Sequence, residues 1–370
     1  MAPPETRPPG DEPRPLRPED ERALARLAAR AFPQPQASFV RPGREVFVVE
    51  ADGGLAAAVI LRVIAIPGGT RIGYVAWAMT DPDHQGRGLA SALVARGIDR
   101  LHELGCTRIV TEIEGHNTAS EAVFRRLGFR RLAFSDQLAA FGLLGAGWLR
   151  LRTGYTGDPG HFLWMQGAEP APPDETLHRV GAWGLNWAFA LLALAVGGGL
   201  VLGGTSRLPT AADAGLMLAA VALLLGAREA AMRATARAHG LPVAFRAWDS
   251  GLGITAGIAL LFGSLFPAPG GVYPREREPH ALDALGAAAL AGTLAVAALV
   301  AASLWAEAAF AGSRAGTAAA MLLFVGKPLV LFDAVMAFPP FQAFNARRIY
   351  ALNRGLWAGV AALGLALFLL

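Results

Sequence analysis

Long apolar runs dominate the last 190 residues of the chain. About 20 consecutive apolar residues are enough to cross a bilayer as a helix, and six runs in so short a stretch leave nothing to cover them in water. The sequence therefore predicts an all-α polytopic transmembrane domain of about six helices over residues 181–370. The predicted spans are Gly181–Gly204, Ala211–Leu225, Leu252–Phe266, Ala284–Trp305, Gly316–Phe338 and Leu356–Leu370.

Charge is distributed unevenly between the two halves. The first 180 residues carry 21 Arg and 21 Asp+Glu, whereas the last 190 carry 12 Arg+Lys and 8 Asp+Glu, so the net charge of +4 lies in the apolar half. This split excludes a single soluble domain and a disordered chain. It also removes the sequence pI of 9.8 as an argument for nucleic-acid binding, and we expect no nucleic-acid partner. The single cysteine, Cys106, excludes a disulfide framework and fits a reducing compartment.

The charge-rich half reads as an α/β domain. Residues 1–13 are Pro-rich and lack the apolar core of a signal peptide, so we expect a disordered tail. Residues 14–167 alternate between strand and helix patterns, and residues 168–180 form a Pro-rich linker to the transmembrane part. The predicted strands are Glu45–Glu50, Leu55–Ile66, Arg71–Thr80 and Arg108–Ile113, and the main predicted helices are Arg87–Leu104 and Thr118–Leu127.

A glycine-containing turn joins the third of these strands to the first of these helices. It reads Gln85-Gly86-Arg87-Gly88-Leu89-Ala90. Glycine lets backbone N–H groups approach an anion closely, and the start of a helix adds partial positive charge. The turn matches neither the P-loop nor the dinucleotide fingerprint. It therefore indicates a pyrophosphate-binding site of another kind.

The order of these elements resembles the GNAT family of acetyl-CoA-dependent N-acetyltransferases. The turn matches that family's Q/R-x-x-G-x-G/A motif, and Asn117, Ser120, Phe124 and Leu127-Gly128-Phe129 match its second motif. The resemblance implies a mixed central sheet with flanking helices over residues 14–167 and acetyl-CoA as cosubstrate. It implies these cofactor contacts: Met79, Thr80, Gln85, Gly86, Arg87, Gly88, Leu89, Ala90 and Asn117. Asn117 also stands where it would cap the next helix.

Acetyl transfer to an amine needs a base for the amine proton, and an acid helps the leaving thiolate. Relatives that acetylate protein N-termini use a Glu five residues before the motif's Asn, a position held here by Glu112, with Glu114 on the same face of the strand. The family's acid is often Tyr, but this position is Phe124. The alternatives are an acetyltransferase in which water protonates the thiolate and a regulatory protein that senses acetyl-CoA without efficient turnover.

The acceptor is left open between a protein or peptide amine and a small amine. The resemblance places residues 135–165 beside the acceptor, and this segment is unusually apolar. Packing of this segment against the membrane half is favoured over an apolar acceptor.

The apolar half resembles the site-2 (M50) intramembrane metalloproteases in the order of its degenerate motifs. Arg228-Glu229-Ala230-Ala231-Met232 stands where those proteins have H-E-x-x-H, Ala291–Val296 where they have A-G-P-L-A-N, and Asn345 where they have their third ligand, Asp. Two His at i and i+4 would bind Zn²⁺ while Glu activates water. Arg228, Met232 and Asn345 replace all three ligands and only Glu229 is retained. We therefore expect no zinc, no protease activity and a pseudoprotease that serves as an anchor and could also bind a membrane-protein partner.

Arginines in the loops of the apolar half predict its orientation in the membrane. Arg233, Arg237 and Arg246 follow the second run and are typical of a cytoplasmic loop, which would place the GNAT-like part in the cytoplasm. Glu229 could form half of an ion pair with the adjacent Arg228, although adjacent residues of a helix do not face each other well.

Simple alternation of six spans puts Arg347, Arg348 and Arg354 on the opposite side. A re-entrant segment, or a span count wrong by one, would remove this conflict. Lys327 interrupts the fifth run, which makes re-entry there plausible, with Asp333 as its partner.

Overall fold

The computed structural model describes residues 12–34, 36–154, 159–168, 176–197, 201, 208–275, 281–338, 341 and 343–370. The predicted tail up to residue 11 and most of the predicted linker, residues 169–175, lie outside these ranges. The chain divides into two compact units. The first covers residues 1–113, 119–154 and 162–171, and the second covers residues 114–118, 155–161 and 172–370.

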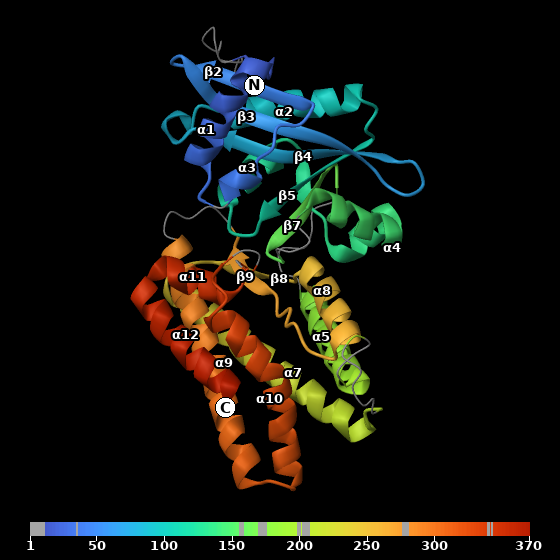
Figure 1. Cartoon of the computed structure of the whole chain (residues 1–370), viewed down its shortest axis with the longest axis vertical. Coiled ribbons are helices and arrows are strands. Elements are labelled where there is room, and N and C mark those ends of the chain that lie inside the picture. Colours follow the sequence, from blue (N-terminus) through green and yellow to red (C-terminus); the bar gives the residue numbers. More distant parts are fainter. Residues whose placement is uncertain are drawn as a thin grey trace. The chain divides into compact units, whose positions relative to one another are not determined.

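The first unit is built on a mixed sheet of seven strands in the order β1-β2-β3-β4-β5-β7-β6 (Figure 1). The strands β1 to β4 pair antiparallel, whereas β4 and β5 pair parallel. The prediction of a mixed sheet with flanking helices is confirmed. The strands are β1 (Arg14–Pro15), β2 (Glu45–Ala51), β3 (Gly54–Ala65), β4 (Arg71–Thr80), β5 (Arg108–Glu114), β6 (Phe129–Arg131) and β7 (His161–Gln166).

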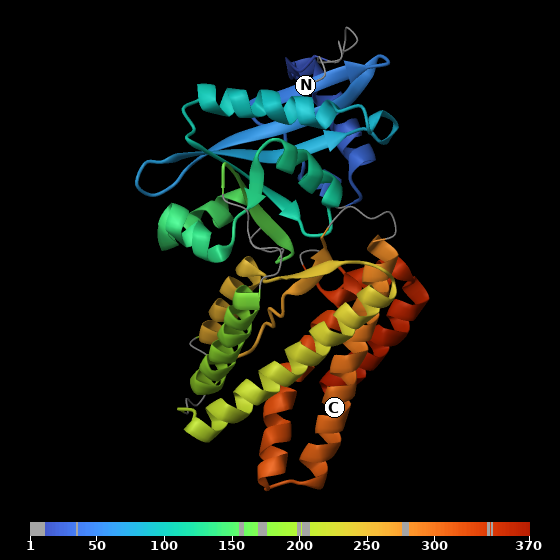
Figure 2. The ribbon, with the colours of Figure 1, turned by 180° about the vertical axis from the view of Figure 1, so that it is seen from behind.

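Helices cover both faces of this sheet. Successive side chains of a strand point to opposite faces, so each face presents apolar side chains on which a helix can pack. Leu24 and Leu27 of α1 (Glu21–Ala31) pack on Val46 and Ile60. On the other face lies α2 (Leu89–Glu103), where a Cβ at its Gly97 would meet the side chain of Leu61 at 2.9 Å. Figures 1 and 2 show these two helices on opposite sides of the sheet. Two further helices, α3 (Thr118–Arg126) and α4 (Phe134–Thr153), follow β5 and β6.

The second unit is mainly helical. Among its described residues, four helices are long and apolar enough to cross a membrane, and α8 and α12 are shorter apolar helices, so the predicted count of six spans is not established. Its elements are α5 (Thr176–Val196), α7 (Ala211–Ala238), β8 (Val243–Arg246), α8 (Asp249–Phe262), β9 (Gly271–Pro274), α9 (Ala281–Ala309), α10 (Arg314–Ala334), α11 (Asn345–Leu352) and α12 (Arg354–Leu369).

The core of this unit lies between α7, α9 and α10, where Val221, Leu224, Val300 and Leu329 are buried. At the level of Met232 the backbones of α7 and α9 come close together. A Cβ at Gly292 of α9 would stand 2.6 Å from Cγ of Met232, so this position requires glycine. The apolar segments of the sequence therefore pack as a helix bundle. Small residues such as Gly292 let the helices approach closely, as is common between membrane helices.

The expected re-entry at Lys327 is wrong, because α10 runs unbroken from Arg314 to Ala334 through Lys327 and Pro328. A segment that turns back lies elsewhere. The strands β8 and β9 pair antiparallel, with Val243 opposite Pro274 and Arg246 opposite Gly271. The chain between them, including α8, therefore leaves one end of the unit and returns to the same end.

Candidate cofactor site and a buried charge cluster

The end of β4 is shaped to leave backbone groups available. Its register with β3 shifts after Ile60, which pairs with Trp77, to Leu61, which pairs with Val75, so Ala76 is an extra, bulged residue. The parallel register of β4 with β5 runs only from Ile72–Arg108 to Val75–Thr111. Beyond that point β4 continues to Thr80 with one edge paired to β3 and the other not paired to β5. Backbone groups of this stretch, which includes Met79 and Thr80, are thereby available for contact with a ligand.

The predicted turn follows directly. Residues 85–88 are exposed, and Gly86 and Gly88 have φ of 82° and 77°, a region that favours glycine. Apart from the adjacent residues of the chain, no atom of the described residues lies within 4 Å of the place where a Cβ of either would stand. Gly88 is the N-cap of α2 and offers no side chain to its first turn. The N–H groups at the start of α2, at Leu89 and Ala90, are therefore arranged as at an anion site.

A network that the sequence did not indicate holds this turn in place. Asp81 is buried and its side chain accepts a hydrogen bond from the N–H of Asp83, at 3.0 Å. Arg30 of α1 donates to both carboxylates, at 2.9 Å to Asp81 and 2.6 Å to Asp83. At the other end of the short helix Pro82–His84, His84 lies 3.1 Å from Asp52. The backbone geometry before Gly86 is thereby fixed by charges from three separate elements.

The carboxylates proposed as bases lie on β5. Glu112 and Glu114 are both half-buried and share one face of the strand, since the buried Thr111 and Ile113 alternate with them. The Oε2 atom of Glu114 lies 3.5 Å from Nε2 of His116.

Asn117 follows β5 in the loop before α3. Its N–H donates to the carbonyl of Glu114 at 2.9 Å, which closes a tight turn after the strand. Glu114 and Asn117 both belong to the segment 114–118 that groups with the second unit. The predicted cofactor contact of Asn117 and its role as a cap stay predictions.

Phe124 is a core residue. It is 4% exposed and its ring packs edge-on against Phe129, with the two centroids 5.1 Å apart. A phenyl ring in this setting supplies no proton. The side chain at this position acts in packing α3 onto the sheet.

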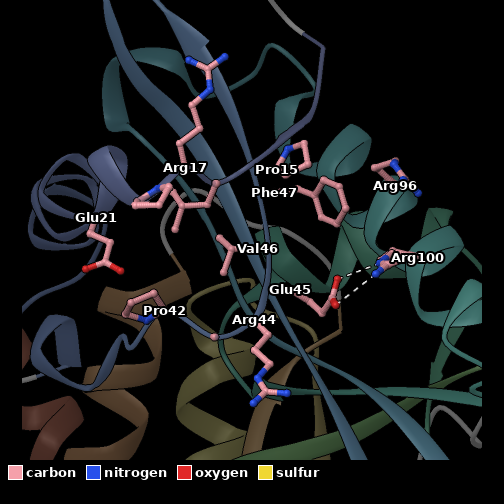
Figure 3. A pocket seen from close by; sticks show the side chains of 13 residues that line it. Pro15, Arg17, Glu21, Pro42, Arg44, Glu45, Val46, Phe47, Arg96 and Arg100 are labelled. Carbon is pink, nitrogen blue, oxygen red and sulfur yellow. Dashed lines mark hydrogen bonds and ion pairs between the residues drawn. The ribbon is translucent and has the colours of Figure 1, made fainter.

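A concavity of about 480 Å³ lies elsewhere in the first unit, between β1, β2 and α2. Its lining does not include the turn 85–90. Figure 3 shows Glu45 and Arg100 side by side in its lining, and their atoms Oε2 and Nε are 2.8 Å apart. Arg96 stacks over Phe47 on the same wall, 4.8 Å from the ring centroid. The lining of this pocket is thus held by an ion pair and a cation–π contact, and the pocket is separate from the candidate cofactor site.

In the second unit, the three positions that replace the expected metal ligands lie together around one carboxylate. Arg228 of α7 donates to Asp333 of α10 through Nε at 2.5 Å and Nη2 at 3.0 Å, and through Nη1 to the carbonyl of Gly270 at 3.0 Å. The side-chain amide of Asn345 donates to Asp333 at 3.1 Å and lies 3.8 Å from the sulfur of Met232. The side chains of Arg228 and Asp333 are 3% and 0% exposed.

The suggested pairing of Asp333 with Lys327 is wrong. Asp333 pairs with Arg228 and not with Lys327. The fold places α7 beside α10, so Arg228 and Asp333 meet although they are 105 residues apart in the sequence. Glu229 pairs not with the adjacent Arg228 but with Arg233, at 2.6 Å one turn on, and with Arg179 of α5, at 2.9 Å. Adjacent helical side chains point in different directions, whereas i and i+4 share a face.

This cluster does not fit a zinc ion. Its groups are a permanent cation, a thioether, an amide and one carboxylate that is already bonded to the cation, and zinc requires imidazole, thiolate or carboxylate ligands. Among the described residues there is also no group of three or more His, Cys, Asp or Glu side chains placed to hold a metal. No hydrolytic step can be derived from it.

Residues 10–129 match the model of the "Acetyltransferase (GNAT) family". This segment contains β4, the turn 85–90 and β5, so it is a GNAT acetyltransferase domain, as the sequence predicted, whereas the predicted bounds of residues 14–167 stay a prediction. The likeness of residues 181–370 to intramembrane metalloproteases stays a prediction.

Individual relatives match over shorter stretches. Mycothiol acetyltransferase from Saccharomonospora viridis is 38% identical over 72 residues, which are 20% of this chain and 24% of that protein. N-alpha-acetyltransferase MAK3 from Arabidopsis thaliana is 41% identical over 59 residues, 16% of this chain and 31% of that protein. The chain thus spans less than a third of the length of these curated relatives.

Two solved structures match part of this chain. The ribosomal-protein-S18-alanine N-acetyltransferase from Escherichia coli is 22% identical with a TM-score of 0.30, covering 43% of this chain and 95% of its own. N-acetylglutamate synthase from Neisseria gonorrhoeae, complexed with coenzyme A and N-acetyl-glutamate, is 19% identical with a TM-score of 0.32, covering 42% of this chain and 34% of its own.

Proposed function

We propose that the first unit transfers the acetyl group of acetyl-CoA to an amine. The observation that carries this proposal is the turn at Gly86 and Gly88 at the start of α2, directly after the bulged and splayed end of β4, within the segment that matches the GNAT family model. The backbone N–H groups of residues 85–90 would hold the pyrophosphate. Backbone groups of Met79 and Thr80 would hold the pantetheine and the thioester carbonyl.

The reaction is a direct transfer. The nitrogen of the neutral amine attacks the thioester carbonyl carbon, a C–N bond forms, the C–S bond breaks, and the amine proton passes to a base while the sulfur leaves as thiolate. Glu112, with Glu114 on the same face of β5, takes the role of base. Because Phe124 is buried against Phe129, water and not a side chain at this position protonates the thiolate. The developing oxyanion is stabilised by backbone N–H donors at the end of β4.

The test is release of free thiol from acetyl-CoA by the purified full chain, with two acceptor classes drawn from the relatives' names: peptides with a free N-terminal amine and small amines. Gly88→Trp is the blocked variant, because its side chain would occupy the space in which no protein atom lies. Gly68→Trp is the matched control, since Gly68 also has positive φ and open space but lies in the turn between β3 and β4. The proposal predicts that Gly88→Trp loses cofactor binding and that Gly68→Trp keeps it.

A second candidate function is an acetyl-CoA sensor without efficient turnover, favoured by the absence of an acid at Phe124. Both candidates require acetyl-CoA binding, and they differ in thiol release. Tight binding without thiol release across both acceptor classes would establish the sensor and refute the transferase.

We further propose that α5, α7, α9 and α10 cross a bilayer in succession and that the arginine-rich end faces the cytoplasm. Since α8 returns to the end from which it leaves, four crossings bring the start of α5, the end of α7 and the end of α10 to one side. The described arginines of that side are Arg179, Arg233, Arg237, Arg246, Arg275, Arg347, Arg348 and Arg354. Among the described arginines outside the buried cluster, only Arg314 falls at the other end. This arrangement satisfies the positive-inside rule without the conflict produced by six alternating spans.

Single-cysteine labelling tests the orientation. In a Cys106→Ala background, the exposed positions His239 and Ala311 are each replaced by Cys. A membrane-impermeant maleimide is expected to label Ala311→Cys in intact cells and His239→Cys only after permeabilisation. The reverse pattern would overturn the orientation, and labelling of both in intact cells would overturn the membrane insertion.

A further inference from the structure

The outer face of α4 is apolar, although it lies on a domain with its own core. Among the described residues of the first unit, the large hydrophobic side chains that are exposed are Phe39, Phe134, Leu143, Leu144, Trp148 and Leu151. All but Phe39 belong to α4. Leu143, Leu144 and Leu151 are 73%, 77% and 65% exposed. Isolated exposed hydrophobic residues are ordinary on protein surfaces, but a cluster on one helix indicates a contact surface.

The helix carries two separate apolar faces. After a kink at Gly142, where φ is 67°, Gly145, Ala146 and Leu149 turn inward and are buried. At 100° per residue, Leu143, Leu144, Trp148 and Leu151 fall within an arc of about 140° on the other side. We call these four side chains the outer face of α4. The inner face already anchors the helix to its domain, so the outer face is not needed for folding.

Arginines border the outer face on both sides. At helical spacing, Arg150 falls about 20° before Leu143 and Arg152 about 40° beyond Trp148. The guanidinium of Arg152 stacks over the Trp148 ring, 5.3 Å from its centroid, and Arg150 donates to Gln137 at 3.0 Å. Trp148 also donates its indole N–H to the carbonyl of Ala65 at 3.1 Å. Leucine and tryptophan flanked by arginine make the pattern of a helix that lies in the plane of a bilayer surface.

The chain itself keeps this domain near a bilayer. β7 ends at Gln166 and α5 begins at Thr176, so nine residues, or ten Cα–Cα steps, join the sheet to the helix that holds the first candidate span. At about 3.6 Å per residue this connection reaches at most about 36 Å. A surface of this kind therefore meets lipid at high local concentration, which lowers the affinity it needs.

We infer that the outer face of α4 is a membrane-docking surface that inserts into the headgroup and upper acyl region of a bilayer containing anionic lipid. This inference rests on the proposed insertion of α5, α7, α9 and α10. Docking holds the acetyltransferase domain against the membrane surface, where the amine acceptor would be met. The occupant is lipid: leucine and tryptophan enter the apolar layer, and Arg150 and Arg152 meet lipid phosphate at its edge.

The experiment uses the full chain in a Cys106→Ala background, reconstituted into vesicles of phosphatidylcholine and phosphatidylglycerol. Leu144→Cys carries an environment-sensitive fluorophore. Phe39→Cys is the matched control, because Phe39 is a large hydrophobic residue of the same unit that is 60% exposed and outside α4. Leu294→Cys in the middle of α9, where Leu294 is 44% exposed, reports the bilayer itself. Quenching is compared between nitroxide-bearing lipid and aqueous iodide.

The expected result is quenching by lipid nitroxide at Leu144→Cys and Leu294→Cys, and quenching by iodide at Phe39→Cys. Iodide quenching at Leu144→Cys, with lipid quenching at Leu294→Cys, would overturn the docking surface alone. Protection of Leu144→Cys from both quenchers would also overturn it, since another protein surface would then cover the helix. Iodide quenching at Leu294→Cys would instead refute the membrane insertion on which the inference rests.

Discussion

Removing the charge of Asp333 should destabilise the second unit far more than removing that of any neighbouring carboxylate. Asp333 is fully buried and receives two hydrogen bonds from the guanidinium of Arg228, which is itself 3% exposed. Asp333→Asn keeps the shape but leaves a buried cation without its counter-charge. Breaking a buried pair in this way costs about 3–5 kcal/mol. For a domain of about 150–250 residues, 1 kcal/mol moves Tm by about 2–4 °C, so we expect a fall of about 6–20 °C.

Glu229→Gln is the matched control for this variant. Glu229 adjoins Arg228 on α7, but its partners Arg179 and Arg233 are 25% and 22% exposed and can turn to water. We expect a cost of about 0–1 kcal/mol there. The double variant Arg228→Met with Asp333→Asn removes both charges, and it should regain at least half of the stability lost in Asp333→Asn, because no uncompensated cation remains.

Thermal unfolding of the full chain in lipid nanodiscs, followed by tryptophan fluorescence, measures these differences. The reasoning fails if Asp333→Asn unfolds within about 2 °C of Glu229→Gln, a difference of less than about 1 kcal/mol. It also fails if the double variant is less stable than Asp333→Asn. Either result would mean that the pair is solvated or broken in the bilayer.

Three further predictions concern other groups. Glu112→Gln should slow thiol release by about 10²–10⁴-fold at saturating acetyl-CoA with little change in cofactor binding, measured by kinetics and calorimetry; an unchanged rate would remove Glu112 as the base. Burial raises the pKa of the Cys106 thiol, so at pH 8 it should react with a disulfide reagent more slowly than free cysteine and reach the free rate only on unfolding. Rapid reaction of the folded protein would contradict its burial. The triple variant Arg228→His, Met232→His and Asn345→Asp should gain one bound Co²⁺ or Zn²⁺ per chain by metal analysis, whereas the native chain and Arg228→His alone should bind none; no gain would mean that these positions are not placed as a ligand set.

Local signals were sufficient for most of the first unit. The strand at Arg71–Thr80 has the predicted ends, and the helix predicted at Arg87–Leu104 begins two residues later, at Leu89, because Gly88 is the N-cap with a positive φ. Glycine and helix periodicity are properties of neighbouring residues, so they can be seen without the fold. The sequence did not predict the bulge at Ala76 or the bonds from Arg30 to Asp81 and Asp83. The bulge depends on pairing with β3 and the bonds depend on the position of α1, so neither leaves a local pattern in the sequence.

In the second unit the sequence identified the apolar helices but not their paths. Hydropathy cannot distinguish a helix that crosses from one that returns, and only the pairing of β8 with β9 shows that the segment containing α8 turns back. The same difficulty affected the charges. The sequence suggested Lys327 as the partner of Asp333 because the two are close along the chain, yet the partner is Arg228, 105 residues away.

The sequence by itself indicated a GNAT domain, a glycine turn at Gly86 and Gly88 suited to an anion, and an apolar half in which Arg228, Met232 and Asn345 are poor ligands for zinc. These are statements about residue type and local spacing, which the order of the chain contains in full. The tertiary structure decided which buried charges neutralise each other. Asp333 accepts from Arg228 and Asn345 at once only because α7, α10 and α11 meet there. Coulomb attraction depends on distance in space, and the fold alone sets that distance.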